Sequence, residues 1–168
     1  AALGQAIRAV GEGKRVLMVQ FIKGPWASGE DEVEIIMKGS PSTRSGQPLF
    51  CLAKKGLGFV GIMGDTLPRR DHERAAERAL EYAKKEMESG KWHIVILDEV
   101  NNAVELGLIS AEKVLSVVKG APRAIEHFIF TGRDAPQEFL EVADLITEMR
   151  EVKHPYQKGI KAKRGVEY

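Results

Sequence analysis

The sequence predicts an α/β fold built on a mostly parallel sheet. Apolar runs rich in strand-forming residues alternate along the chain with segments of helical periodicity. The runs are continuous rather than alternating, which is typical of strands buried on both faces of a parallel sheet. The length of 168 residues is that of one ordinary domain, and no internal repeat divides it. We therefore expect a single domain over residues 1–168.

Each element follows from its local pattern. Segments in which apolar residues recur at helical spacing are predicted to be helices: 2–10, 69–89, 104–107, 111–118 and 136–143. Apolar runs that turn residues bound are predicted to be strands: 16–22, 33–36, 93–99, 128–133 and 145–149. Residues 58–62 are either a glycine-broken strand or a loop. Three arginines at i+4 spacing in the longest helix are interpreted as a solvated face rather than a phosphate-binding stripe.

The composition argues against several partners. Lysine and arginine number 25 against 24 aspartates and glutamates, and this balance gives no reason to expect a nucleic-acid partner. No apolar run approaches the roughly 20 residues of a membrane span, so we expect no membrane partner. Cys51 is the one cysteine, which excludes an internal disulfide and makes a reducing, cytoplasmic location the default expectation.

One stretch is expected to be a loop insertion, near residues 38–55. Its central part, 39–48, is rich in serine, proline and glycine. We expect a poorly ordered surface excursion whose deletion leaves the fold intact. Two origins are open: a genuine lid insertion, or an artefact of sequencing or splicing.

The candidate site lies where the predicted strands end. In open α/β sheets, ligands bind outside the carboxyl ends of the strands. The polar residues at those ends are Gln20, Lys23, Asp98, Glu99, Thr131 and Arg133. Four apolar residues followed by Asp98-Glu99 have the shape of a Walker B strand, whose carboxylates bind Mg²⁺ or orient a nucleophile. The alternative is that Asp98 simply caps the next helix. We expect both carboxylates at the carboxyl end of a central strand, beside the end of the 16–22 strand.

A Walker B strand requires a phosphate-binding loop as its partner. The motif G-x-x-x-x-G-K-[ST] should stand between a first strand and a first helix, and this sequence does not contain it. The first predicted helix is already under way at residue 1, where such a loop would just have ended. We therefore expect truncation after the loop, and weak or absent ATP binding by the sequence as printed. The upstream coding sequence would decide this.

Several segments together resemble one family, the P-loop-type corrinoid adenosyltransferases, which act on cob(I)alamin or cob(I)yrinic acid a,c-diamide. The matching segments occur in order and span nearly the whole chain apart from about 38–55: they are 4–11, 19–24, 58–59, 95–99, 131–133 and 151–162. The resemblance implies a RecA-like P-loop NTPase three-layer sandwich, N-terminally truncated, and a homodimer. It also implies an enzyme that transfers the 5′-deoxyadenosyl group of ATP to cobalt and releases triphosphate, in adenosylcobalamin biosynthesis or salvage.

The resemblance also assigns roles to residues. Asp98 and Glu99 match the acidic pair associated with Mg²⁺, and Glu99 is the expected catalytic residue. Phe59 matches an aromatic segment beneath the corrin, for which a core phenylalanine is the alternative. Some family members carry tryptophan two residues later, where this chain has Gly61. The corrinoid substrate must be reduced, so an electron donor is an expected partner.

Four further residues match positions that contact the nucleotide. Arg8 matches an arginine implicated in nucleotide binding, within the protomer or across the dimer. Gln20 and Lys23 match a strand end that faces the nucleotide, and Arg133 closes the matching segment 131–133. For Arg8 and Lys23 the alternative is a solvated surface side chain.

Two other functions stay open at this point. A chain that lacks the phosphate-binding loop is a candidate for a catalytically defective fragment, or for a non-enzymatic corrinoid- or nucleotide-binding protein of the same fold. A different P-loop enzyme, such as a RecA-like ATPase or a nucleoside kinase, is the third reading. The match over 151–162 speaks against the third.

Overall fold

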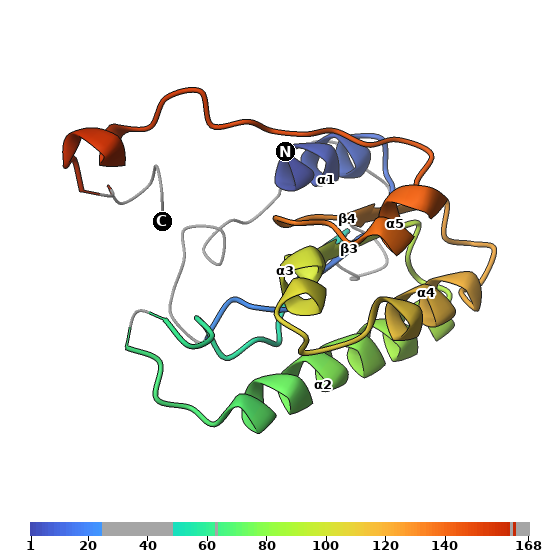
Figure 1. The fold of residues 1–168 in the computed structure, drawn as a ribbon. Coiled ribbons are helices and arrows are strands. Elements are labelled where there is room, and N and C mark those ends of the chain that lie inside the picture. The colour runs from blue at the N-terminus through green and yellow to red at the C-terminus, as the bar shows by residue number, and fades with distance from the viewer. Residues whose placement is uncertain (25–48, 63, 162, 164–168) are drawn as a thin grey trace.

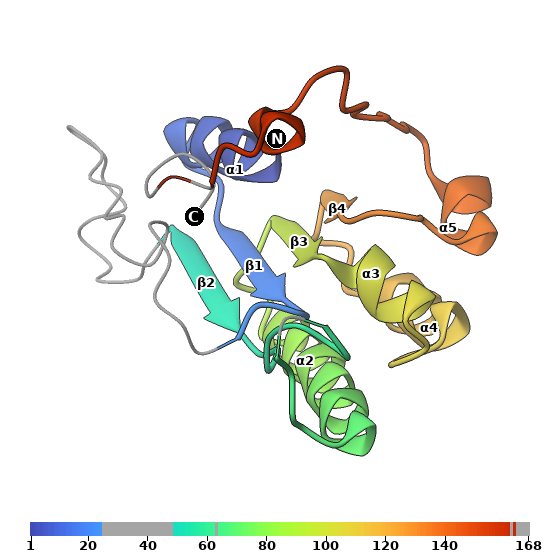
Figure 2. The ribbon, with the colours of Figure 1, turned by 60° about the vertical axis from the view of Figure 1, so that its left-hand side comes forward.

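The computed structural model describes residues 1–24, 49–62, 64–161 and 163. At its centre lies a sheet of four parallel strands in the order β2-β1-β3-β4. The strands are β1 (Val16–Gln20), β2 (Phe50–Lys54), β3 (Ile94–Asp98) and β4 (His127–Phe130). Figure 2 shows β2, β1 and β3 side by side. The predicted α/β class with a parallel sheet is confirmed.

Helices lie on both sides of this sheet. They are α1 (Ala2–Gly11), α2 (Arg69–Glu88), α3 (Val100–Glu105), α4 (Ala111–Lys119) and α5 (Gln137–Val142), followed by the 3₁₀ helix η3 (Pro155–Lys158). In Figure 1, α1 lies above the strands, whereas α2 and α4 lie below them. No helix in the described part of the chain is long and apolar enough to cross a membrane.

The alternation of side chains along the strands produces the three layers. Val16 and Met18 of β1 pack with Ala6 and Val10 of α1 on one face. The side chains on the other face pack with the small residues of α2 and with α4. They are Leu17 and Val19 of β1 and Val95 and Leu97 of β3. All five residues of β1 are buried, as a strand covered on both faces must be.

Two features of this arrangement position the candidate site. β1 and β3 are direct neighbours in register, so that Gln20 lies opposite Asp98 at their carboxyl ends. The short connection over 12–15 makes α1 run antiparallel to β1, which directs the start of α1 toward the same edge of the sheet. The predicted central position of Asp98, beside the end of the 16–22 strand, is confirmed.

Three sequence predictions differ from the structure. The helix predicted at 104–107 begins earlier, as α3, because Glu99 turns the chain sharply at the end of β3. The strand predicted at 145–149 does not form: Leu145 and Met149 are 84% and 79% exposed, and no described strand lies beside the segment to supply a ladder. Residues 50–54, which were assigned to the loop insertion, form the edge strand β2 and pair with β1.

The remaining predictions on this region fall where the structure gives no description. The strand candidate 33–36 and the loop 39–48 lie outside the described residues. Residues 58–62 are a loop, which was one of the two alternatives. The arginines at i+4 spacing in α2 (Arg70, Arg74 and Arg78) are exposed, as the solvated-face interpretation predicts.

Candidate active site

The site is built on a hydrogen bond between the ends of two neighbouring strands. Gln20 is 1% exposed, and its Nε2 donates to Oδ2 of Asp98 at 3.0 Å. The two residues are register partners, so the strand pairing itself holds their side chains within reach. The fixed backbone of β1 and β3 therefore fixes the position of the Asp98 carboxylate.

The next strand end completes the support of this carboxylate. Thr131 follows β4, and its hydroxyl donates to Oδ1 of Asp98 at 2.7 Å. The same hydroxyl accepts the backbone N–H of Glu99 at 2.9 Å. Both oxygens of Asp98 are thus held by neutral donors from β1 and from the residue after β4. A carboxylate held in this way keeps lone pairs for a cation without reorienting.

Glu99 has a strained backbone and a partly buried side chain. Its φ and ψ are 59° and 21°, in the left-handed region that non-glycine residues rarely adopt. Burial raises the pKa of its carboxyl, the nearby Asp98 raises it further, and the positive charge of Lys23 opposes the rise. Oε2 of Glu99 is buried, and no described residue offers it a hydrogen bond. This geometry leaves an acceptor whose natural partner is a cation or a bound donor.

Two more buried oxygens in this network have no partner within the described ranges. They are Oε1 of Gln20 and Oδ1 of Asn101. Gln20 is bonded to Asp98 through its other amide atom, and the Asn101 backbone N–H donates to the Thr131 carbonyl at 3.2 Å. Unpaired oxygens thus sit on three residues that are each one hydrogen bond from the Asp98–Thr131 pair. Buried acceptors in native proteins rarely stay unpaired, which points to a ligand, an ion or water.

The donor set fits Mg²⁺ better than a softer metal. Mg²⁺ prefers oxygen ligands, keeps several waters and is usually held by one or two carboxylates together with substrate phosphates. Asp98 and Glu99 supply two carboxylates at this edge. The described residues hold no cluster of three or more histidine, cysteine, aspartate or glutamate side chains suited to a metal. A metal here would therefore depend on its water and its phosphate ligands.

Asn102 and Gly132 shape the side of the site next to β4. Oδ1 of Asn102 accepts the backbone N–H of Arg133 at 3.1 Å. Gly132 has φ of +126°, and a Cβ at this position would lie 2.5 Å from the same oxygen. Asn101 and Asn102 could not be predicted as site residues from the sequence, because polar residues in the first turn of a helix carry no specific signal.

The other predicted site residues differ in how they are connected to this centre. Lys23 follows β1, and its positive charge lowers the pKa of the Glu99 carboxyl. Arg133 is exposed after β4 and is tied to α3 through its backbone. Arg8 is exposed on α1, and its guanidinium makes no hydrogen bond or ion pair to any described residue. The structure thus gathers Gln20, Asp98 and Glu99, whereas no hydrogen bond or ion pair links the Arg8 side chain to them.

Phe59 lies on a segment that is tied to the end of β1. The backbone N–H groups of Lys55 and Gly56 donate to the Gln20 carbonyl at 3.0 and 3.2 Å, and that of Gly58 donates to the Ile22 carbonyl at 2.8 Å. A Cβ at Gly56 would overlap the backbone of Ile22, so only glycine fits this approach. Phe59 itself is 46% exposed, which argues against the core-phenylalanine alternative.

Comparison with known proteins identifies the family. The model of the ATP:corrinoid adenosyltransferase family BtuR/CobO/CobP matches residues 1–168. The chain belongs to this family. A corrinoid adenosyltransferase of Sinorhizobium sp is 36% identical over 176 residues, covering 100% of this chain and 73% of the relative. The corrinoid adenosyltransferases of Escherichia coli K12 and Pseudomonas aeruginosa are 33% and 35% identical, covering 100% and 99% of this chain and 78% and 76% of the relatives.

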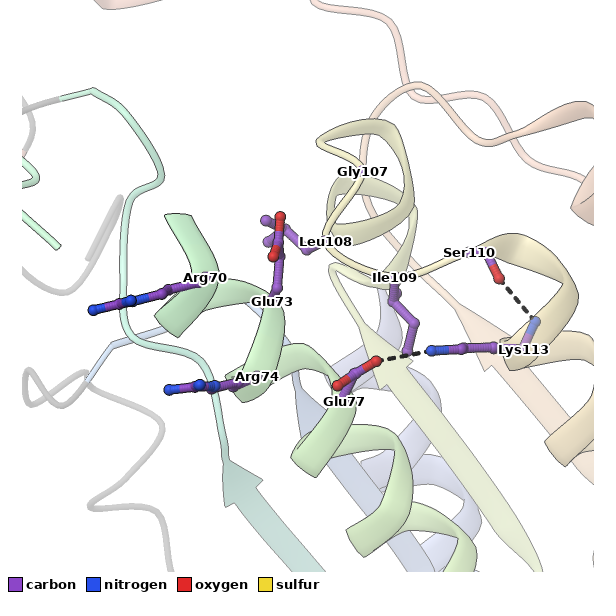
Figure 3. A pocket seen from close by; sticks show the side chains of 9 residues that line it. All are labelled: Arg70, Glu73, Arg74, Glu77, Gly107, Leu108, Ile109, Ser110 and Lys113. Carbon is purple, nitrogen blue, oxygen red and sulfur yellow. Dashed lines mark hydrogen bonds and ion pairs between the residues drawn. The ribbon is translucent and has the colours of Figure 1, made fainter. Parts of the chain in front are cut away.

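As a member of the adenosyltransferase family, the chain is a transferase that uses ATP as co-substrate for a corrinoid. The RecA-like, P-loop NTPase-type class that the resemblance implied fits its parallel sheet between helices. A shallow hollow of about 340 Å³ lies elsewhere in this adenosyltransferase, between α2 and the turn 107–110 (Figure 3). None of the predicted site residues lines it, and Lys113 beside it is paired with Glu77 at 2.8 Å. The carboxyl edge of β1 and β3 remains the candidate active site.

Proposed function

We propose that the carboxyl edge of β1 and β3 is the catalytic centre of adenosyl transfer, with Glu99 as its catalytic residue. The observation that carries this proposal is the Glu99 carboxylate: partly buried, beside Asp98, with one oxygen unpaired among the described residues. A strained backbone at such a residue is typical of functional sites. A purely structural carboxylate would be either paired or exposed.

In this proposal Asp98 and Glu99 hold Mg²⁺. The bound ion would supply charge neutralisation at the triphosphate as it leaves. Asp98 can serve this role without reorienting, because Gln20 and Thr131 already fix both of its oxygens. Gln20 then acts on the nucleotide mainly by positioning Asp98, and its unpaired Oε1 is available to a donor on the nucleotide.

The chemical step requires little covalent work from the protein. The reduced cobalt of cob(I)alamin or cob(I)yrinic acid a,c-diamide attacks C5′ of ATP. A Co–C5′ bond forms, the C5′–O bond breaks, and its electron pair leaves with triphosphate. The residues of this chain therefore orient the two substrates and balance the charge of the leaving group. An electron donor supplies the reduced corrinoid beforehand.

The remaining roles concern substrate contacts and assembly. Lys23 and Arg133 stand at the strand ends and balance nucleotide charge. Arg8, whose side chain is exposed on α1, contacts the nucleotide of a partner protomer in a homodimer. Phe59 supports the corrin ring with its exposed face. The cytoplasm is the proposed location, since it supplies reductant and ATP.

The test uses this chain with a strand and a G-x-x-x-x-G-K-[ST] loop supplied ahead of residue 1, and all alkylation assays below use the same protein. It measures conversion of chemically reduced cobalamin with Mg-ATP to a light-sensitive alkylcobalamin, together with release of triphosphate. Glu99→Gln should lower the rate by about 100-fold. Glu105→Gln, at the exposed end of the same helix, is the matched control and should keep the rate. Release of phosphate from ATP without alkylation of cobalt would overturn this proposal and indicate that the protein is an ATPase. Corrinoid binding without either reaction would indicate a non-enzymatic binding protein.

A further inference from the structure

A buried histidine outside the candidate active site makes a specific contact that the reaction does not use. His72 lies in the first turn of α2 and is 3% exposed. Its Nε2 lies 3.1 Å from Oδ2 of Asp65, whose side chain is 7% exposed. The other buried residues of α2 are apolar, mostly alanine. A buried polar pair on such a face costs free energy unless its hydrogen bonds are made, so its contacts indicate what it holds.

Asp65 gathers three donors. Besides His72, it accepts the backbone N–H of Gly61 at 2.8 Å and that of Leu67 at 3.0 Å. These two backbone hydrogen bonds, with a smaller effect of His72, hold the pKa of Asp65 below its usual value. Asp65 is therefore an ionised carboxylate that only accepts, which assigns the proton of the shared bond to Nε2 of His72. The carboxylate thus joins the backbone of Gly61 to that of Leu67, and the imidazole ties this turn to α2.

The same segment is fixed at its other end to the candidate site. Lys55, Gly56 and Gly58 donate their backbone N–H groups to the carbonyls of Gln20 and Ile22. Phe59 stands between this attachment and the turn that Asp65 closes. The backbone hydrogen bonds to Gln20 and Ile22 fix one end of the segment to β1 and the residues that follow it. The Asp65–His72 hydrogen bond fixes the other end to α2. The path of the chain through Phe59 is thus set from both sides.

We propose that Asp65 and His72 form a latch that fixes residues 55–62 and 64–67 and so positions Phe59 for the corrinoid. The proposal rests on the function proposed above for Phe59. An exposed aromatic side chain binds a flat ring more tightly when its loop is already ordered, since the entropy of ordering is then not lost on binding. Asp65 and His72 are positioning residues: neither is assigned a contact with substrate.

Two substitutions at one position separate the hydrogen bond from the volume of the side chain. His72→Phe keeps a buried ring and removes the donor to Asp65. His72→Gln keeps an N–H near the position of Nε2 and should restore the latch. Asp65→Asn removes one acceptor without changing volume, and serves if His72→Phe does not fold. Phe59→Ala tests the corrinoid contact independently of the latch.

The first measurement is hydrogen exchange at the Gly61 and Leu67 amides in the folded protein. His72→Phe and Asp65→Asn should speed exchange at both amides by about tenfold or more, with no change in β1. His72→Gln should stay close to the parent. The second measurement is titration with cob(II)alamin, followed by its absorption spectrum. The latch variants should bind it about tenfold more weakly, with KM for cobalamin raised and KM for ATP unchanged.

The outcomes distinguish failure of the latch from failure of the proposed function. Unchanged exchange at Gly61 and Leu67 in both latch variants would overturn the latch. Faster exchange with unchanged cobalamin binding would overturn its positioning role. If Phe59→Ala also left cobalamin binding unchanged, the corrinoid role of Phe59 would fail with it. Weaker binding in Phe59→Ala and in His72→Phe, together with rescue by His72→Gln, supports the proposal.

Discussion

Gln20 and Asp98 lie opposite each other at the carboxyl ends of two parallel strands, and Nε2 of Gln20 donates to Oδ2 of Asp98 at 3.0 Å. The bond joins a residue that is almost fully buried to one that borders the candidate site. It therefore links the packing of the sheet to the position of a proposed metal ligand. A substitution at Gln20 should therefore change both the free energy of unfolding and the rate of the reaction.

We expect Gln20→Met to lower the free energy of unfolding by about 1–3 kcal/mol, because it leaves an acceptor of Asp98 without its donor. Methionine matches the length of glutamine and leaves no large cavity. Denaturation by urea checks the stability, and the alkylation assay should show a slower rate at subsaturating Mg²⁺. A variant as stable and as active as the parent would show that the bond positions nothing.

The ionisation of Glu99 should make the free energy of unfolding depend on pH. Its folded-state pKa is raised above the usual 4.5, chiefly by burial. Such a group stabilises the fold fully below its unfolded-state pKa and loses this contribution as pH rises through the folded-state value. We therefore expect Glu99→Gln to be more stable than the parent at about pH 7 and equal to it at about pH 4. Urea denaturation at both pH values checks this, and a gain at low pH alone would contradict it.

The parallel sheet and the position of the acidic pair could be predicted because continuous apolar runs are strong signals. β1 and β3 are buried on both faces, and Asp98 ends its run abruptly. β2 was missed because an edge strand is only half covered: four of its five residues are partly exposed. Its sequence also adjoins a stretch rich in serine, proline and glycine, which favours a loop.

Other features depend on contacts that local sequence does not encode. Residues 145–149 have strand propensity, yet a strand needs a neighbouring ladder, and the described structure offers none there. The left-handed backbone of Glu99 and the support from Thr131 both arise from the packing of β3 against β4. The hydrogen bond between Asp65 and His72 joins a turn to α2, and no sequence motif predicts this contact.

Thr131 offers a test of the support around Asp98. Thr131→Val has nearly the same shape but loses the hydroxyl, which donates to Asp98 and accepts from the Glu99 backbone. We expect a loss of about 1–3 kcal/mol in unfolding free energy and a clear fall in the alkylation rate. Thr131→Ser keeps the hydroxyl and should retain most of both. Equal behaviour of the two variants would show that the hydroxyl is not what matters.

Gly132 should tolerate no side chain, because space and backbone both exclude one. Its φ is +126°, and an added Cβ would lie 2.5 Å from Oδ1 of Asn102 and 3.0 Å from Cβ of Asn101. Gly132→Ala should therefore cost about 1–3 kcal/mol or more through backbone strain, and displace α3 from the end of β4. That displacement would disturb the hydrogen bond from the Arg133 backbone to Asn102, and with it the edge next to Glu99.

The matched control is Gly4→Ala, inside α1. A Cβ there meets nothing within 4 Å, and alanine is the better helix former. We expect a gain of about 0.5–1 kcal/mol, opposite in sign to the loss at Gly132. Urea denaturation of both variants shows whether the free energy of unfolding rises or falls. The alkylation assay should show a raised KM for ATP only in Gly132→Ala. A neutral Gly132→Ala would mean that the turn after β4 can move without cost, and that Thr131 is less rigidly held than its bonds to Asp98 and Glu99 indicate.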